Sequence, residues 1–84
     1  MKENLVLDNV SKALMEICTK NNFHKIEKLE IIVDNSSDLT RQELYDYLEI
    51  HNASVIGDWT EISLKREDIG GLTAIIHNLQ GEQS

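Results

Sequence analysis

The chain has 84 residues, 40% of them hydrophobic and 27% charged, which is the composition of one small folded domain and not of a disordered segment. Its 15 acidic residues against 8 basic ones give a net charge of −7, and this balance disfavours a nucleic-acid partner, because a phosphate backbone is bound by a basic face. A single cysteine excludes an internal disulfide and a thiolate zinc cage, and no apolar run is long enough to cross a membrane. We therefore expect one domain over residues 1–84, in the cytoplasm and without a membrane partner.

The first two elements are expected to be a helix over residues 4–21 and a strand over residues 25–33. In the helical stretch, apolar residues recur at the spacing of one helix face, and the two asparagines that follow are a suitable stop. In the strand, alternate residues are apolar, as in a strand with one buried face. The positions expected in the core are Val6, Val10, Ala13, Leu14 and Ile17 of the helix and Leu29, Ile31 and Val33 of the strand.

A turn-forming segment, residues 34–38, separates this strand from a second helix. Thr40 and Glu43 form a capping-box pattern, which predicts that the helix starts there, and it should run to about His51. The residues expected on its buried side are Leu44, Tyr47, Leu48 and Ile50.

Two strands are expected to complete the fold. Residues 60–65 alternate between apolar and polar side chains, and residues 72–79 are rich in β-forming residues. The short glycine-containing segment between them, residues 66–71, predicts a β-hairpin. The element order is therefore α-β-α-β-β, and its simplest packing places two helices on one face of a three-stranded, largely antiparallel sheet.

No arrangement of residues typical of catalysis is present in the sequence, so we expect a protein that is not an enzyme. The three histidines, His24, His51 and His77, do not have the spacing of metal ligands on one helical turn. Cys18 has no basic neighbours in the sequence that would activate its thiol, and it is better interpreted as a small core residue. The aromatic residues that would either cover the core or anchor an interface are Tyr45, Tyr47 and Trp59.

Two stretches of the chain resemble the HypA family, the nickel-insertion proteins of hydrogenase and urease maturation. Chains of that family begin Met-His-Glu and continue through a helix to a His-Gly-Phe-like turn and a Lys-Val-x-x-Val-x-x-x-Ile strand. This sequence follows the family's pattern through residue 33 without a gap. The expected second helix and the last two expected strands fall where the family has the corresponding elements. The matching stretches are Met1-Lys2-Glu3-Asn4-Leu5 and Asn22-Phe23-His24-Lys25-Ile26-Glu27-Lys28-Leu29-Glu30-Ile31-Ile32-Val33.

The resemblance implies a degenerate metal site. In the HypA family, nickel is bound through the N-terminal amine, the histidine at position two and nearby acidic residues. Here Lys2 replaces the histidine, and its ammonium group is not a ligand and repels a cation. Met1, Glu3 and Asp38 are left to hold nickel, so at most weak nickel binding is expected. The family's four-cysteine zinc loop is reduced to residues 66–71, so we expect no zinc.

The function implied by the resemblance is that of a non-enzymatic accessory or adaptor protein in the maturation of nickel metalloenzymes such as hydrogenase. It would act by binding a protein, either a maturation GTPase or a metalloenzyme precursor, as a monomer or weak homodimer. The residues expected to contact the partner are Lys2, Glu43, Asp46 and Glu49, of which the three acids lie one helical turn apart.

Two other functions stay open. The chain is a residual nickel metallochaperone if its N-terminus holds the metal and a partner completes the coordination shell. It is an unrelated small acidic interaction domain if the resemblance is accidental. An acidic decoy of nucleic acid would cluster its carboxylates on one face, whereas this sequence spreads them along the whole chain.

Overall fold

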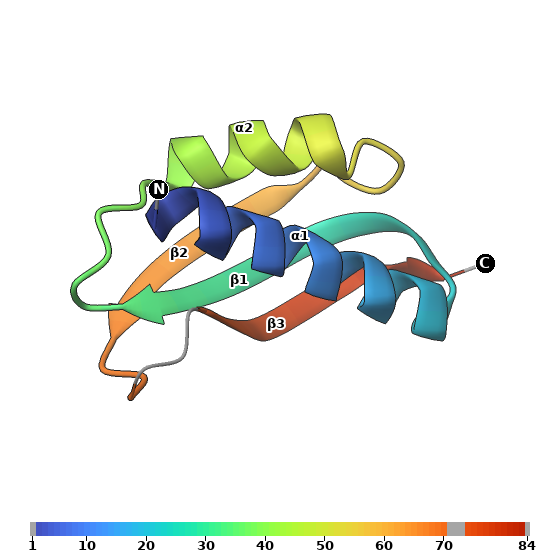
Figure 1. The fold of residues 1–84 in the computed structure, drawn as a ribbon. Helices are drawn as coiled ribbons and strands as arrows, with labels where there is room; N and C mark the ends of the chain where they lie inside the picture. Colours follow the sequence, from blue (N-terminus) through green and yellow to red (C-terminus); the bar gives the residue numbers. More distant parts are fainter. Residues whose placement is uncertain (1, 71–73, 84) are drawn as a thin grey trace.

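The computed structural model describes residues 2–70 and 74–83, with side chains from Leu5 onward within these ranges (Figure 1). The expected element order is confirmed, and each strand is one or more residues longer than expected, although residues 72 and 73 of the last expected strand lie outside the described residues. The elements are α1 (Lys2–Asn21), β1 (Phe23–Asp34), α2 (Arg41–His51), β2 (Glu61–Glu67) and β3 (Ala74–Gln83).

The three strands form one mixed sheet with the order β2-β1-β3. β1 lies in the centre, parallel to β2 and antiparallel to β3. The fold class is as expected, but the hairpin across residues 66–71 is wrong, because β2 and β3 lie on opposite sides of β1. The reason is the β1-α2-β2 crossover: α2 carries the chain back along the sheet, so β2 must run parallel to β1 at one edge. β3 then pairs with the other edge.

Both helices cover the same face of the sheet, and the opposite face is not covered by a helix (Figure 1). The inner row of β1 is completely buried at Ile31 and Val33, and Leu14 of α1 is buried as well. Burying each such side chain stabilises the fold by about 2 kcal/mol. The core residues contributed by the helices are Leu7, Val10, Leu14 and Cys18 of α1 and Leu44 and Leu48 of α2.

The helix boundaries follow from the local sequence. Asn22 adopts a left-handed conformation, with φ of 58°, and ends α1 as expected. Thr40 is the N-cap of α2, and its hydroxyl and the Glu43 carboxylate complete the predicted capping box. Ile50, however, is 74% exposed, so its expected burial is wrong. It lies about 200° around the helix from Leu48, whose side chain is buried, and therefore points away from the sheet.

A buried polar pair joins the two helices. The Ser11 hydroxyl donates to the Asn52 side-chain oxygen at 2.7 Å, and the Asn52 amide donates to the Ser11 carbonyl at 3.2 Å. Asn52 directly follows α2 and is 1% exposed. Because both groups are buried and paired, removing one partner would leave the other buried and unsatisfied at a cost of about 1–3 kcal/mol. The pair therefore fixes the middle of α1 against the end of α2.

The pairing of β1 with β3 contains three register shifts. One of them places an extra residue, Glu27, between two paired positions, which explains why Ile26 and Leu29 both point into the core although they are three residues apart. Near this shift, a Cβ atom at Gly81 would collide with the Lys25 carbonyl oxygen. Gly81 is therefore needed for the close approach of the two backbones.

Replacing Gly81 by alanine should lower the free energy of unfolding by about 1–3 kcal/mol, because the new methyl group forces the two strands apart. Urea denaturation monitored by circular dichroism measures the change. The exposed neighbour Gln80 provides the control, since Gln80→Ala should change the stability by less than about 0.5 kcal/mol. Equal stability of Gly81→Ala and the native chain would contradict the close approach.

Candidate functional site

The expected nickel site lies mostly outside the described residues. Met1 is not described, and the structure describes only the backbone of Lys2 and Glu3, in the first turn of α1. Asp38 is exposed in the segment between β1 and α2. The two helices run in the same direction, so the start of α1 and the segment that carries Asp38 lie at the same end of the molecule (Figure 1).

The three acids expected to contact a partner are all exposed on α2. We call Glu43, Asp46 and Glu49 the acidic ridge. Leu44 and Leu48 face the core, so the ridge faces away from the sheet. Two of its carboxylates accept hydrogen bonds within the helix: Asp46 from the Gln42 amide at 2.8 Å, and Glu49 from the Tyr45 hydroxyl at 3.1 Å. These contacts keep the two carboxylates close to the surface of α2.

The three histidines lie apart from one another. His24 and His77 are the residues without a strand partner at two of the register shifts between β1 and β3. The Nε2 atom of His24 lies 3.3 Å from the Glu82 carboxylate. His51 ends α2, and its ring stacks on Tyr47 with the ring centres 4.0 Å apart. Among the described residues, no group of three or more His, Cys, Asp or Glu side chains is placed to hold a metal ion.

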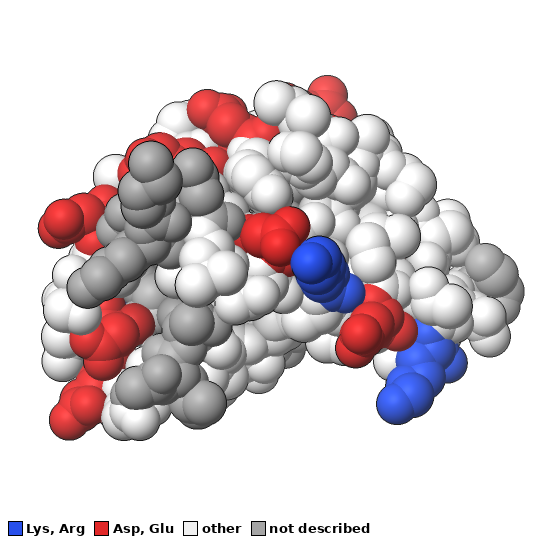
Figure 2. Space-filling model, in the orientation of Figure 1, with Lys and Arg blue, Asp and Glu red and all other residues white. Residues whose placement is uncertain are grey.

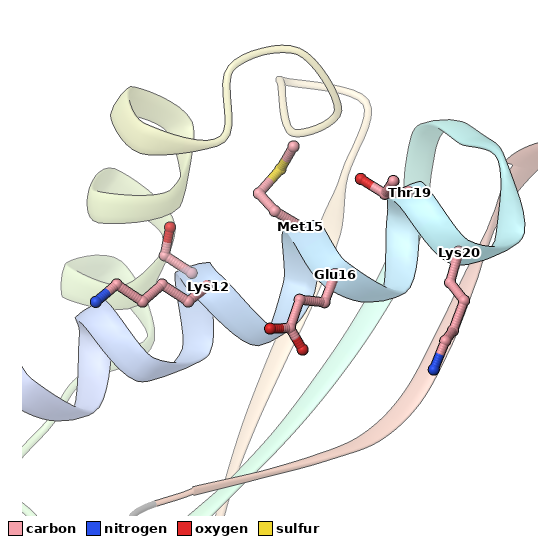
Figure 3. Close-up of a pocket in the computed structure, with 6 residues that line it drawn as sticks. Lys12, Met15, Glu16, Thr19 and Lys20 are labelled. Atoms are coloured by element: carbon pink, nitrogen blue, oxygen red, sulfur yellow. The ribbon is translucent and has the colours of Figure 1, made fainter.

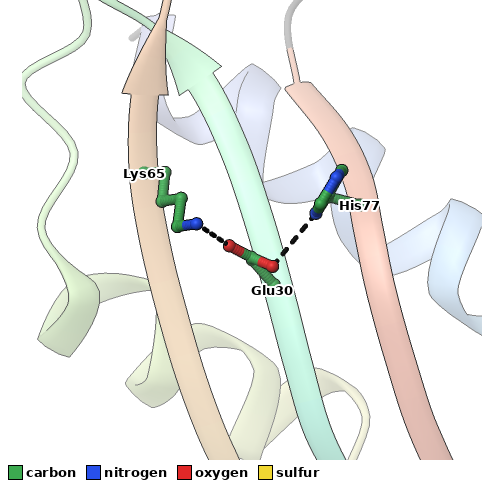
Figure 4. A network of polar contacts seen from close by, with 3 residues as sticks. All are labelled: Glu30, Lys65 and His77. Atoms are coloured by element: carbon green, nitrogen blue, oxygen red, sulfur yellow. Dashed lines mark hydrogen bonds and ion pairs between the residues drawn. The ribbon is translucent and has the colours of Figure 1, made fainter.

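A charged network that the sequence did not predict lies on the uncovered face of the sheet (Figure 4). Glu30 of β1 accepts a hydrogen bond from Lys65 of β2 at 2.7 Å and lies 3.0 Å from the Nδ1 atom of His77 of β3. The register shift at His77 turns its ring toward Glu30, as bulges do to side chains. Lys65, and to a lesser extent His77, hold the pKa of Glu30 below its ordinary value. The network joins all three strands.

The expected burial of Cys18 is confirmed, with 3% of the residue exposed. Burial raises the pKa of its thiol, which disfavours the reactive thiolate. Of the aromatic residues, Tyr45 and Tyr47 pack against the core, whereas Trp59 is 44% exposed. The Trp59 ring covers Gly57, and the Lys25 ammonium group lies 5.2 Å from its centre. Trp59 therefore packs against Gly57 and also leaves part of its apolar ring exposed to solvent.

A shallow, open depression of about 730 Å³ lies along the outer surface of α1, where Met15 and Thr19 point toward the chain that follows α2 and Glu16 and Lys20 point away from it (Figure 3). Met15 lies near its middle and is 36% exposed. The charged side chains that line it are two lysines and one glutamate. We call this the α1 groove, and its lining residues are Ser11, Lys12, Met15, Glu16, Thr19 and Lys20.

No protein-family model and no curated protein sequence matches this chain. Within the described residues, no helix is long and apolar enough to cross a membrane.

The Glu30 network predicts a pH-dependent stability. Because the pKa of Glu30 is lowered in the folded chain, its ionised form stabilises the fold at neutral pH, and this contribution is lost as the pH falls from the ordinary glutamate value of 4.5 through the lowered one. Glu30→Gln should therefore be less stable than the native chain at pH 7, and the difference between the two stabilities should shrink steadily as the pH falls below 4.5. Urea denaturation at several pH values measures this.

The control for this experiment is Glu61→Gln. Glu61 is exposed on β2 and forms no ion pair with another described residue. The difference in free energy of unfolding between Glu61→Gln and the native chain should be small and nearly constant between pH 7 and pH 3. A difference for Glu30→Gln that does not change over the same range would contradict the role of the ion pairs.

Proposed function

We propose that this chain is a non-enzymatic, HypA-like accessory protein that acts by binding a protein during the maturation of a nickel metalloenzyme such as hydrogenase. The observation that carries the proposal is the resemblance of residues 1–33 to the opening of HypA-family chains, which needs no gap. The element order, in which a helix and a strand are followed by a second helix and two further strands, agrees with that resemblance. The absence of a β2–β3 hairpin departs from our expectation, so the proposal rests on the resemblance and the element order alone.

The surface best suited to the partner is the acidic ridge. It places three carboxylates along one outward-facing side of α2, and two of them are held by neighbouring side chains of the same helix. Acidic side chains are spread over the face in Figure 2, including the edge along which α2 lies. A row of negative charges attracts and orients a partner with a complementary basic surface. We propose a maturation GTPase or a metalloenzyme precursor with such a surface as the partner.

Metal delivery is not part of this function. Lys2 places a positive charge at the position where the family has an imidazole ligand. Nickel prefers a site with several nitrogen ligands. Without the imidazole, the remaining backbone and carboxylate groups bind nickel weakly, because the ammonium group beside them repels the cation. We propose that the chain contributes contacts to a maturation complex and leaves the nickel to other members of that complex.

Reversing the charge of the acidic ridge should weaken partner binding. The variant with Asp46→Lys and Glu49→Lys, which leaves the capping box at Glu43 intact, should bind the maturation GTPase of the same organism, or the metalloenzyme precursor, at least about tenfold more weakly than the native chain. Isothermal titration calorimetry with the purified partner measures the dissociation constant.

The control reverses two exposed acids elsewhere, Glu61 and Glu67, and so changes the net charge by the same amount. This variant should bind within about threefold of the native chain, because only long-range attraction is reduced. Equal weakening of both variants would rule out the acidic ridge as the contact. Failure of the native chain to bind either kind of partner would contradict the adaptor function.

A residual metallochaperone is the second candidate. It is favoured by the segment between β1 and α2, which includes Asp38 and lies at the same end of the molecule as the start of α1. The adaptor proposal predicts no tight one-to-one binding when the chain is titrated with nickel at neutral pH. The chaperone alternative predicts such binding and its loss when residues are added before Met1, because the N-terminal amine is then removed from the site. Binding that survives the extension would exclude an N-terminal site.

A further inference from the structure

Two exposed features of the helical layer take no part in packing against the sheet. One is the α1 groove, a shallow and open depression along α1 with Met15 near its middle. The other is Ile50 of α2, which at 74% is the most exposed of the large hydrophobic residues in the described part of the chain. A large apolar side chain that points into solvent from a well-packed helix is typical of an interface anchor.

Ile50 cannot reach the groove of its own chain. It points away from the sheet because it lies about 200° around α2 from the buried Leu48. The groove belongs to the flank of α1 on which Ser11 binds Asn52, so the end of α2 is already fixed beside it. An occupant of the groove must therefore approach from outside the molecule, over the helical layer.

The charges on the two features are complementary. The groove carries Lys12 and Lys20 near its two ends with Glu16 between them, and Lys12 also pairs with Asp8 on the same helix at 3.1 Å. In Figure 2 the basic side chains of this face lie over α1. On the outer side of α2, by contrast, acidic residues lie next to the exposed Ile50. These are Asp46, one helical turn before Ile50, and Glu49.

We propose that the groove is occupied by a second copy of this chain, in a two-fold dimer in which Ile50 of each copy sits against Met15 of the other. The groove and Ile50 lie on the same layer, so one two-fold axis can form both contacts at once, as an isologous interface requires. Lys12 and Lys20 of each copy then face Asp46 and Glu49 of the other. The inference goes beyond the proposed function and does not depend on it, because it needs only this chain.

Sedimentation equilibrium of the purified chain tests the dimer. The weight-average mass should rise from 9.6 kDa toward twice that value between about 10 µM and about 1 mM, the range expected of a small, transient interface. Ile50→Ser should raise the dissociation constant at least about tenfold. Leu5→Ser is the matched control, because Leu5 is 57% exposed on α1 but does not line the groove, and it should leave the constant within about threefold of the native value.

A charge exchange tests the orientation. The variant Lys12→Glu with Lys20→Glu and the variant Asp46→Lys with Glu49→Lys should each be monomeric alone, since their own grooves and α2 helices repel. An equimolar mixture should form a heterodimer, because both contacts are then complementary. Circular dichroism and urea denaturation check that each variant is folded.

Three outcomes would overturn the proposal. The first is a mass of one copy at every concentration. The second is a dimer that Ile50→Ser leaves intact, which would point to pairing of the free edges of β2 or β3 instead. The third is a mixture of the two charge variants that stays monomeric although both variants are folded.

Discussion

The structure depends on the position of β1 in the centre of the sheet. Its inner side chains lie under both helices, and its backbone is paired with β2 on one side and with β3 on the other. Because a one-residue slip of this strand would turn its buried row to the opposite face, the register of the whole sheet is fixed by the burial of Leu29, Ile31 and Val33. The helices pack on this row, and the surfaces that they present outward follow from it.

Local features of the fold were predictable from the sequence because neighbouring residues determine them. The capping box at Thr40 and the helix end at Asn22 depend on side chains and backbone conformations within a few positions. The hairpin prediction was wrong, because a glycine-containing segment between two strands does not determine which strands pair. Here the crossover through α2 places β2 parallel to β1 at one edge, and β3 pairs with the other edge.

The features of the candidate sites were harder to predict. The Glu30 network depends on a register shift that turns His77 toward a residue 47 positions away, and alternation alone gives no sign of such a shift. Ile50 was expected in the core because it is apolar, although its angle around the helix relative to Leu48 places it outside. The exposure of the acidic ridge, in contrast, follows from the spacing of Leu44 and Leu48.

The two proposals assign different contacts to one surface. In the proposed function, the acidic ridge meets a basic partner, and in the proposed dimer, Asp46 and Glu49 face the lysines of a second copy. Self-association and partner binding would then exclude each other, and the partner would act on the monomer. Both ideas require α2 to lie on the sheet with its acids outward, and therefore require the crossover from β1 to a parallel β2.

The most direct test of this arrangement is a set of cross-strand nuclear Overhauser effects measured by NMR on the native chain in solution. The account predicts backbone contacts in parallel register between Leu29 and Ile62, and in antiparallel register between Ile31 and Ile76. A ladder of contacts that joins β2 directly to β3 would contradict the central position of β1, and with it the surfaces on which both proposals rest.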